Sequence, residues 1–268
     1  MTVLLEVEGL EVVYGHVVRA IQGVSFVVQE GTIVCLVGLN GAGKTTTIRA
    51  ISGFLATENV RITDGRMRFD QKSIRGLRPY QTAQLGISVV PEREKVFDTL
   101  TVRENLELAV AQTKREQAKT ARYRSAEDIF RLFPGLRERA DQDSIFLSGG
   151  ERQMLAIGAC LISNPRLLIV DEASLGLAPM MRQQVLHLLG QLNRDLGLTV
   201  LIVDQDVVGV LSIAHHGYIL EHGRVVFDGP RDQLLKHEDV REFYLGQTKE
   251  HDRGYHEVKQ YRRVRRWH

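Results

Sequence analysis

The chain has 268 residues, of which 43% are hydrophobic and 25% charged, a composition typical of a globular protein with a sizeable core. The formal net charge is only +2, and it arises near the end of the sequence. Residues 249–268 hold seven Lys or Arg and three acids, which leaves 28 basic and 30 acidic side chains elsewhere. A nearly neutral body attracts a phosphate backbone weakly, so we expect no nucleic-acid partner.

The sequence lacks the signs of a secretory signal, a disulfide framework and a membrane span. Its first residues have no basic n-region and reach an acid by Glu6. Cys35 and Cys160 share no CxxC spacing and are expected to be buried thiols. The apolar run Ile33–Val37 is far too short to cross a bilayer. We therefore expect a soluble, cytoplasmic protein that needs a partner for any role at a membrane.

The first part of the chain is strand-like and then helical. Runs rich in β-branched residues predict strands at residues 3–13, 24–28 and 33–38. The last of these leads into a glycine-rich turn, and the pattern becomes helical from Lys44. Further on, Asp64-Gly65 lies between short strand-like segments within residues 60–70, which predicts a hairpin.

A helical insertion interrupts this pattern between about residues 95 and 160. Its first helix begins with a capping-box pattern, Thr101-x-x-Glu104. A charged, solvated stretch is expected at residues 112–124, a helix closed by Pro134 near 125–133, and another helix at 150–163. We interpret the insertion as a subdomain.

The remaining elements return to an alternation of strands and helices. Expected strands at 167–170 and 199–203 flank a helix near 180–194, and residues 217–229 predict an antiparallel hairpin turning at His222-Gly223. Short apolar strands that alternate with helices indicate a mainly parallel sheet covered on both faces. The sequence therefore predicts an α/β fold.

The turn after the third expected strand carries a phosphate-binding pattern. Gly38-Leu39-Asn40-Gly41-Ala42-Gly43-Lys44-Thr45 matches GxxxxGK[ST]. Glycines let backbone N–H groups point at phosphate oxygens, and the following helix adds the positive end of its dipole. Lys44 can reach β- and γ-phosphates, and the Thr45 hydroxyl suits Mg²⁺. The alternative, a purely structural glycine-rich turn, is disfavoured by the strand–helix context.

Two acids, Asp171 and Glu172, follow the apolar strand-like run at 167–170. Ligands of open α/β sheets bind beyond the carboxyl ends of the strands. Asp171 suits coordination of Mg²⁺, directly or through water, and Glu172 suits the polarisation of an attacking water. By itself the pair would more often be a solvated strand end, but behind a phosphate loop it indicates a hydrolytic site.

A second anion-binding helix start occurs at Leu147–Gln153, LSGGERQ, where a serine hydroxyl precedes bare glycine backbone. One nucleotide does not need two such cradles in one chain. In a two-fold or pseudo-two-fold dimer, however, one chain's cradle could close over the phosphate held by the other. Such a pairing would make the nucleotide site a shared one.

LSGGE after a phosphate loop, with a helical insertion between them, resembles the ATP-binding cassette (ABC) family over about residues 3–245. The resemblance implies a P-loop NTPase core with a mainly parallel sheet, an antiparallel β subdomain and a helical signature subdomain. Residues 1–245 would form the cassette domain, with the helical subdomain at about 95–160. Residues 246–268 would be a basic C-terminal extension.

The resemblance also implies that ATP is sandwiched between the phosphate loop of one subunit and the signature of the other. Tyr14 stands where the family stacks an aromatic ring on adenine, although a strand-packing tyrosine is the alternative. The residues implied to bind ATP are Tyr14, Gly38, Asn40, Gly41, Ala42, Gly43, Lys44, Thr45, Thr46, Ser148, Gly149, Gly150 and Glu151. The implied Mg²⁺ ligands are Thr45, Glu92 and Asp171, and the implied catalytic residues are Lys44, Glu172 and Gln205.

Three residues depart from the common family pattern. Glu92 replaces the usual glutamine, Gln205 the usual switch histidine and Ala178 the usual aspartate. Glu92 can still bind Mg²⁺ but adds negative charge near the phosphates, and Gln205 can hydrogen-bond a γ-phosphate without carrying positive charge. We expect hydrolysis to be slower, or more dependent on partner subunits.

These departures, with VPE, LTVRENL and SLGLAP, resemble one of the two cassette subunits of branched-chain amino acid importers. That branch includes importers of urea, other amino acids and small carboxylates. The resemblance implies a second cassette, two transmembrane permease subunits, a separate substrate-binding protein and a position on the inner face of the cell membrane. It also implies that a segment from Lys95 to about 112 docks on a membrane subunit.

The basic tail and two other functional classes remain open. The tail is expected to be a solvated end, with contact to anionic lipid, to the membrane partner or to nucleic acid as alternatives. A soluble cassette ATPase acting on DNA or ribosomes would usually carry a long coiled-coil insertion or two cassettes, and the span between Glu92 and Ser148 is too short for the former. A small-molecule kinase would have no use for LSGGE.

Overall fold

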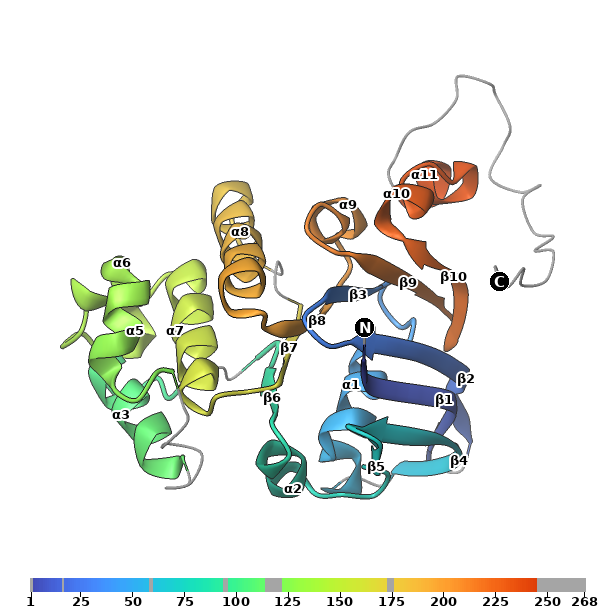
Figure 1. Ribbon diagram of the computed structural model, residues 1–268, viewed down its shortest axis with the longest axis horizontal. Helices are drawn as coiled ribbons and strands as arrows, with labels where there is room; N and C mark the ends of the chain where they lie inside the picture. Colours follow the sequence, from blue (N-terminus) through green and yellow to red (C-terminus); the bar gives the residue numbers. More distant parts are fainter. Residues whose placement is uncertain are drawn as a thin grey trace.

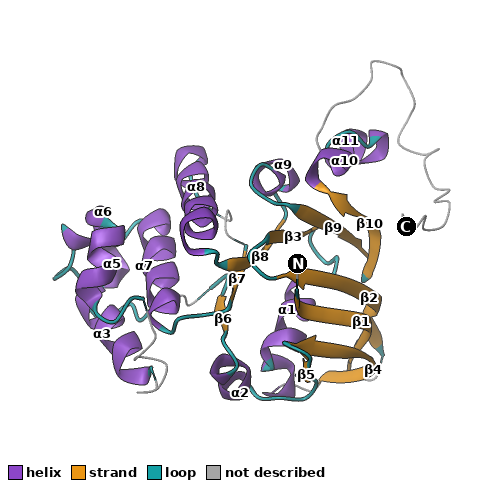
Figure 2. Cartoon of the chain, in the orientation of Figure 1, coloured by secondary structure: helices purple, strands orange, loops and turns teal. Residues whose placement is uncertain are grey.

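The computed structural model describes residues 2–15, 17–57, 60–93, 96–113, 122–172 and 176–244. Within these ranges the chain forms two sheets with helices around them (Figures 1 and 2). The first sheet is antiparallel with the order β2-β1-β4-β5. Its strands are β1 (Val3–Tyr14), β2 (Val18–Gln29), β4 (Val60–Phe69) and β5 (Lys72–Ser73).

The second sheet has six strands in the order β10-β9-β3-β8-β7-β6, in which β10 alone runs antiparallel to its neighbour. Its strands are β3 (Ile33–Val37), β6 (Ile87–Val90), β7 (Leu167–Asp171), β8 (Thr199–Asp204), β9 (His216–Glu221) and β10 (Arg224–Pro230). The mainly parallel sheet, the antiparallel β sheet and the predicted α/β fold are therefore confirmed. The hairpin turning at His222-Gly223 is also present, with both residues at positive φ.

Alternate residues of the central strands enter two separate cores, because successive side chains of a strand point to opposite faces. Val34 and Leu36 of β3 pack with the antiparallel sheet and α1 (Lys44–Ser52). Ile33, Cys35 and Val37 pack with the helices on the other face. With both faces covered, these strands read as continuous apolar runs in the sequence.

A group of helices gathers at one end of the molecule (Figure 1). It consists of α3 (Val102–Gln112), α5 (Ala126–Leu132), α6 (Pro134–Arg137), the 3₁₀ turn η2 (Ser144–Phe146) and α7 (Gly149–Ile162). The remaining helical elements are η1 (Phe54–Thr57), α2 (Pro79–Gln84), α8 (Pro179–Leu196), α9 (Val207–Leu211), α10 (Arg231–Leu234) and α11 (Glu238–Tyr244). The capping box at Thr101 is formed: its hydroxyl accepts from the Glu104 N–H at 3.2 Å.

One local prediction was wrong, and another was right but incomplete. Asp64-Gly65 does not turn the chain, because β4 runs through it as one strand paired with β1. Gly65 has φ +97°, and a Cβ there would lie 2.5 Å from the Leu10 Cα, so the glycine marks an irregular, close approach of two strands. Pro134 does not only close α5: it also begins α6 at the first helical position.

Two further expectations concern segments that the structure describes little or not at all. Most of the charged stretch at 112–124 lies outside the described residues, and so does the whole basic extension at 246–268. Among the described helices, none combines the length and the apolar character that a bilayer span requires.

Candidate functional site

Four neighbouring strands end at the same edge of the six-stranded sheet. Val37 of β3 pairs with Asp204 of β8, and Val203 of β8 pairs with Asp171 of β7. β6, which precedes Glu92, is the next strand. Because these strands are parallel, the phosphate-loop sequence and the segments that hold Gln205, Glu172 and Glu92 all leave the sheet on one side. The topology thus gathers residues that are far apart in the sequence.

The phosphate-loop sequence forms a tight turn between β3 and α1. Gly43 is the N-cap of α1 and has φ +104°, a left-handed conformation that favours glycine. Lys44 then begins the helix with its side chain folded back over the loop. Its Nζ donates to the carbonyl oxygens of Gly38 at 2.9 Å and Leu39 at 3.3 Å. The loop therefore has the strand–glycine turn–helix context predicted for a phosphate cradle.

The buried Lys44 ammonium also joins the loop to the acidic pair. Its Nζ lies 3.4 Å from Oε1 of Glu172, and both side chains are buried. Glu172 sits just beyond β7 at φ +52°, while its N–H donates to the Val203 carbonyl at 2.7 Å. This backbone conformation is uncommon for a residue with a side chain and is held here by the neighbouring strand. The predicted lysine and glutamate therefore meet.

A cavity of about 540 Å³ opens beside this contact. Its lining residues are Ala20, Asn40, Gly41, Gly43, Lys44, Thr45, Thr46, Glu92, Arg93 and Glu172. The wall thus combines most of the predicted phosphate loop with two predicted acids. Sequence reasoning missed Ala20 and Arg93: nothing marks Ala20, whereas Arg93 follows Glu92 directly and its Nε lies 3.2 Å from Glu92 Oε1.

The acids at the strand ends repel one another in a buried setting. Burial, together with the nearby charges of Glu172 and Glu92, raises the pKa of Asp171 to about 7. Burial likewise raises the pKa of Glu172, although Lys44 opposes the shift. In the described part of the chain, Asp171 Oδ1 and Glu172 Oε2 are buried without a hydrogen-bond partner. Asp171 does not line the cavity, whereas Glu172 shares its wall with Thr45 and Glu92, and oxygen ligands of these kinds fit a Mg²⁺ ion.

A buried aspartate holds the segment that contains Gln205. Asp204 is fully buried, and its Oδ1 accepts hydrogen bonds from the N–H groups of Gln205 at 2.8 Å and Asp206 at 3.0 Å. Its charge also contributes to the raised pKa of Glu172. The sequence prediction does not include Asp204, although its carboxylate directly precedes the switch position in the sequence VDQD. Gln205 itself does not line the cavity.

Tyr14 lies at the end of β1, next to the helix that follows the loop. Its hydroxyl is 3.3 Å from Oγ1 of Thr46. The tyrosine is partly exposed and also packs against the apolar core of the antiparallel sheet, as the strand-packing alternative predicts. This position keeps an aromatic ring beside the phosphate loop, although Tyr14 is not among the cavity residues.

The four signature residues, Ser148–Glu151, lie apart from the cavity, at the start of α7. Ser148 and Glu151 form a capping box: the Ser148 N–H donates to Glu151 Oε2 at 2.8 Å, and the Glu151 N–H donates to Ser148 Oγ at 3.3 Å. A Cβ on Gly150 would meet the end of the Met181 side chain of α8, which would have to move to make room for it. Ser148 and Gly149 are exposed. The chain thus presents this cradle to the outside.

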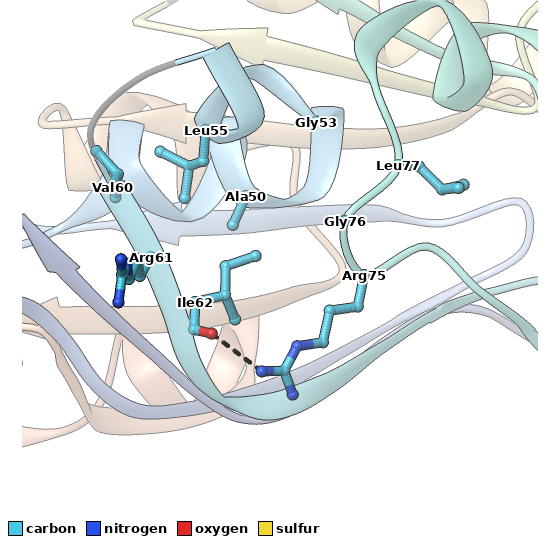
Figure 3. A pocket seen from close by; sticks show the side chains of 9 residues that line it. All are labelled: Ala50, Gly53, Leu55, Val60, Arg61, Ile62, Arg75, Gly76 and Leu77. Carbon is cyan, nitrogen blue, oxygen red and sulfur yellow. Dashed lines mark hydrogen bonds between the residues drawn. The ribbon is translucent and has the colours of Figure 1, made fainter.

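A second hollow, of about 320 Å³, lies between α1, β4 and the segment after β5 (Figure 3). It contains none of the predicted site residues. Its lining is mostly apolar, and the Arg75 guanidinium donates to the backbone carbonyls of Ile62 at 3.0 Å and Gly65 at 2.9 Å. These bonds give Arg75 a structural role, and the hollow offers no phosphate cradle.

Comparison with known proteins agrees with this geometry. Residues 21–175 match the model of the ABC transporter family. The chain is 38% identical to the high-affinity branched-chain amino acid transport ATP-binding protein BraG of Pseudomonas aeruginosa, over 91% of this chain and all of that protein. It is 36% identical to the probable branched-chain amino acid transport ATP-binding protein LivF of Archaeoglobus fulgidus, over 82% of this chain and 89% of that protein.

A solved structure gives the same result for the fold. It is the ADP conformation of an ATP-binding cassette of an ABC transporter, which is 26% identical and aligns with a TM-score of 0.75. The alignment covers 92% of this chain and the whole of that cassette. On the family match, the close relatives and the shared fold, this chain belongs to the ABC transporter family, as one of its ATP-hydrolysing cassettes.

Proposed function

We propose that the chain is the ATP-hydrolysing subunit of an importer for branched-chain amino acids or related small polar solutes. The observation that carries the proposal is the contact between Lys44 and Glu172 at the wall of the cavity. It joins a phosphate cradle to a carboxylate that can act on water. The names of the two relatives described above support the solute class.

The phosphate loop binds the nucleotide in this proposal. Backbone N–H groups of Gly38–Thr46 and the start of α1 face the phosphates, and Lys44 contacts the β- and γ-phosphates. Lys44 exchanges its contacts with the Gly38 and Leu39 carbonyls and Glu172 for phosphate oxygens. Tyr14, held beside Thr46, stacks on the adenine ring.

Hydrolysis uses the acids at the strand ends. Thr45, Asp171 and Glu92 would hold Mg²⁺, which would neutralise phosphate charge when bound. Glu172 orients and polarises the attacking water, and the Gln205 amide hydrogen-bonds the γ-phosphate. Because Gln205 supplies no positive charge, stabilisation of the transition state by this chain's own residues depends more on Lys44.

The second cradle requires a second cassette. Ser148–Glu151 lie outside this chain's cavity and are partly exposed, so we propose that they close over the phosphates held by another cassette. That cassette is a second copy or a different chain. The pair works with two transmembrane permease subunits and a separate substrate-binding protein, and it is peripheral on the inner face of the cell membrane.

The test uses a Lys44→Ala variant. Loss of a charge-assisted phosphate contact should weaken Mg-ATP binding by about tenfold or more, measured by calorimetry. Lys72→Ala, which removes a lysine on β5 at the far edge of the antiparallel sheet, is the matched control. Unchanged ATP affinity in Lys44→Ala would contradict the assigned role.

Uptake of radiolabelled leucine, isoleucine and valine tests the solute class in cells that carry either variant as their only copy. We expect uptake to be lost with Lys44→Ala and kept with Lys72→Ala. Uptake that persists at the parent rate with Lys44→Ala would exclude branched-chain amino acids as the transported solute.

A further inference from the structure

The short segment before the signature lies against a loop from another part of the chain. We name residues 144–148 the signature turn and residues 97–101 the adjoining loop. The Ser144 N–H donates to the Leu100 carbonyl at 2.9 Å, and the Ile145 N–H donates to the Asp98 carbonyl at 3.2 Å. An isolated bridge between Thr101 and Asp143 extends this contact. The two segments therefore form one hydrogen-bonded unit.

Asn105 of α3 fastens this unit from the inside. Its side chain is buried, and its Oδ1 accepts from the Phe97 N–H at 2.8 Å. Its amide nitrogen Nδ2 lies between 2.9 and 3.3 Å from four acceptors. These are Ser144 Oγ and the backbone carbonyl oxygens of Phe97, Leu100 and Thr101. Ser144 is fully buried, so its hydroxyl cannot exchange this partner for water. One amide thus spans both segments.

Arg152 fastens the same unit from the outside. It lies in the first turns of α7, immediately after the signature. Its Nη1 lies 2.9 Å from Asp98 Oδ1 in the adjoining loop, and its Nη2 donates to the Ile145 carbonyl at 2.6 Å in the signature turn. A planar guanidinium that holds two groups at once restricts their relative position.

We propose that Asn105 and Arg152 are positioning residues, which lock the signature turn to the adjoining loop so that Ser148 keeps a fixed geometry toward the nucleotide of a second cassette. The inference rests on the proposed function, in which the signature completes a shared ATP site. Neither side chain lines the cavity of its own chain. Their effect should therefore appear in closure of the dimer and not in nucleotide binding to the phosphate loop of the same chain. A displacement of the adjoining loop, which carries the exposed Phe97, would move Ser148 with it.

Hydrogen exchange without nucleotide tests the lock itself. Asp98→Ala removes the ion pair to Arg152 from a half-exposed position, so the fold should be retained. We expect the Ser144 and Ile145 amides to exchange about two- to fivefold faster, the range of an exposed ion pair. Asp141→Ala is the matched control, because Asp141 is an exposed acid that pairs with Arg103 on α3. Equal exchange at these amides in both variants would overturn the proposal.

The buried contact is tested in the same way. Asn105→Asp keeps the shape but removes both N–H donors, and it should speed exchange at Ser144 more than Asp98→Ala does. Ser144→Ala, which removes only the hydroxyl acceptor, serves if Asn105→Asp does not fold. Unchanged exchange around the signature turn in the folded variant would remove Asn105 from the proposal.

Dimerisation then tests the consequence for Ser148, in a Glu172→Gln background that slows hydrolysis. Asp98→Ala and Arg152→Ala should each raise the ATP concentration for half-maximal dimerisation about two- to fivefold. The double variant should show no larger shift than Arg152→Ala alone, because Arg152→Ala already breaks the ion pair that Asp98→Ala removes. ADP affinity of the monomer should stay constant. If the Glu172→Gln protein never dimerises with ATP, the proposed shared site is wrong. If it dimerises normally, but the ATP concentration for half-maximal dimerisation is unchanged in the variants or the shifts of Asp98→Ala and Arg152→Ala add in the double variant, the proposed lock is wrong.

Discussion

At the scale of single residues, the site is a set of mutually repelling acids held against one lysine. Asp171, Glu172 and Asp204 are buried at neighbouring strand ends, and the charge of Glu92 reaches the first two. Lys44 neutralises part of this negative charge through its contact with Glu172. Such an arrangement is unfavourable by itself and becomes favourable when a cation binds. We infer that Mg²⁺ with a nucleotide stabilises the cassette as well as completing its chemistry.

The first prediction concerns Glu172. Glu172→Gln keeps the size and the strained backbone but cannot polarise water, so ATP turnover should fall by at least about a hundredfold. The variant should then remain an ATP-bound dimer, seen by light scattering with excess Mg-ATP. A persistent monomer under these conditions would count against the shared site.

The second prediction concerns the pH dependence of stability without nucleotide. The pKa of Asp171 is about 7 in the folded chain and ordinary in the unfolded chain, so the unfolded state loses this proton first as pH rises. The Asp171 contribution to the free energy of unfolding therefore falls between about pH 4 and pH 7 and is constant above that range. In urea unfolding, Asp171→Asn should gain stability relative to the parent across this window. A pH-independent difference between the two would contradict the raised pKa.

At the scale of elements, the start of α8 shows how a departure from the family pattern acts physically. Ala178 is the N-cap of this helix, and no side chain caps the helix there. Aspartate, the residue common at this family position, is among the best N-cap residues. The alanine therefore leaves an N–H group of the first turn without the side-chain acceptor that an aspartate would give. The missing cap lowers the stability of α8. The sequence alone shows only that Ala178 departs from the family pattern.

The third prediction follows from that cap. Ala178→Asp should raise the free energy of unfolding by about 1 kcal/mol, measured from urea denaturation midpoints. Ala178→Asn supplies the same acceptor without charge and separates the cap from the helix dipole and from repulsion by nearby acids. An Ala178→Asn variant no more stable than the parent would show that the first turn of α8 gains nothing from a cap.

Elements with strong local signals were predictable from the sequence, and elements decided by tertiary contact were not. Local sequence patterns mark three of these elements: the capping box at Thr101, the turn at His222 and the strand before the phosphate loop. Asp64-Gly65 has the sequence pattern of a turn, but Gly65 is needed because Leu10 of β1 approaches it closely. The sequence predicts that the site residues lie close together, because parallel strands end at the same side of a sheet. The position of Arg93 at the cavity depends instead on the path of the segment after β6.

At the scale of the whole molecule, the phosphate loop and the signature belong to two different nucleotide sites in the proposed dimer. The cavity beside the phosphate loop lies at the strand ends of the six-stranded sheet. The signature begins α7, which belongs to the helical group at one end of the molecule (Figure 1). Hydrogen bonds from Asn105 and Arg152 make that helical group continuous with its exposed loop. In the proposed dimer, the signature of one cassette therefore acts at the nucleotide that the other cassette holds.

The fourth prediction concerns the basic extension, whose structure lies outside the described residues. Deleting residues 250–268 should leave basal ATP hydrolysis intact and weaken association with membranes, because clustered Lys and Arg side chains attract anionic lipid. Co-sedimentation with membrane vesicles measures this effect. Replacement of Arg262, Arg263, Arg265 and Arg266 by Gln keeps the length and isolates the charge. Loss of basal ATP hydrolysis in the truncated chain would contradict the prediction.

The central claim is that this cassette drives an importer, and its partners test that claim most directly. The tagged chain is purified in mild detergent from its native membranes, and the chains that co-purify are identified by mass spectrometry. We predict two polytopic membrane proteins together with a second cassette or a second copy of this chain. Recovery from the soluble fraction with ribosomes or nucleic acid, and without a membrane protein, would contradict the account.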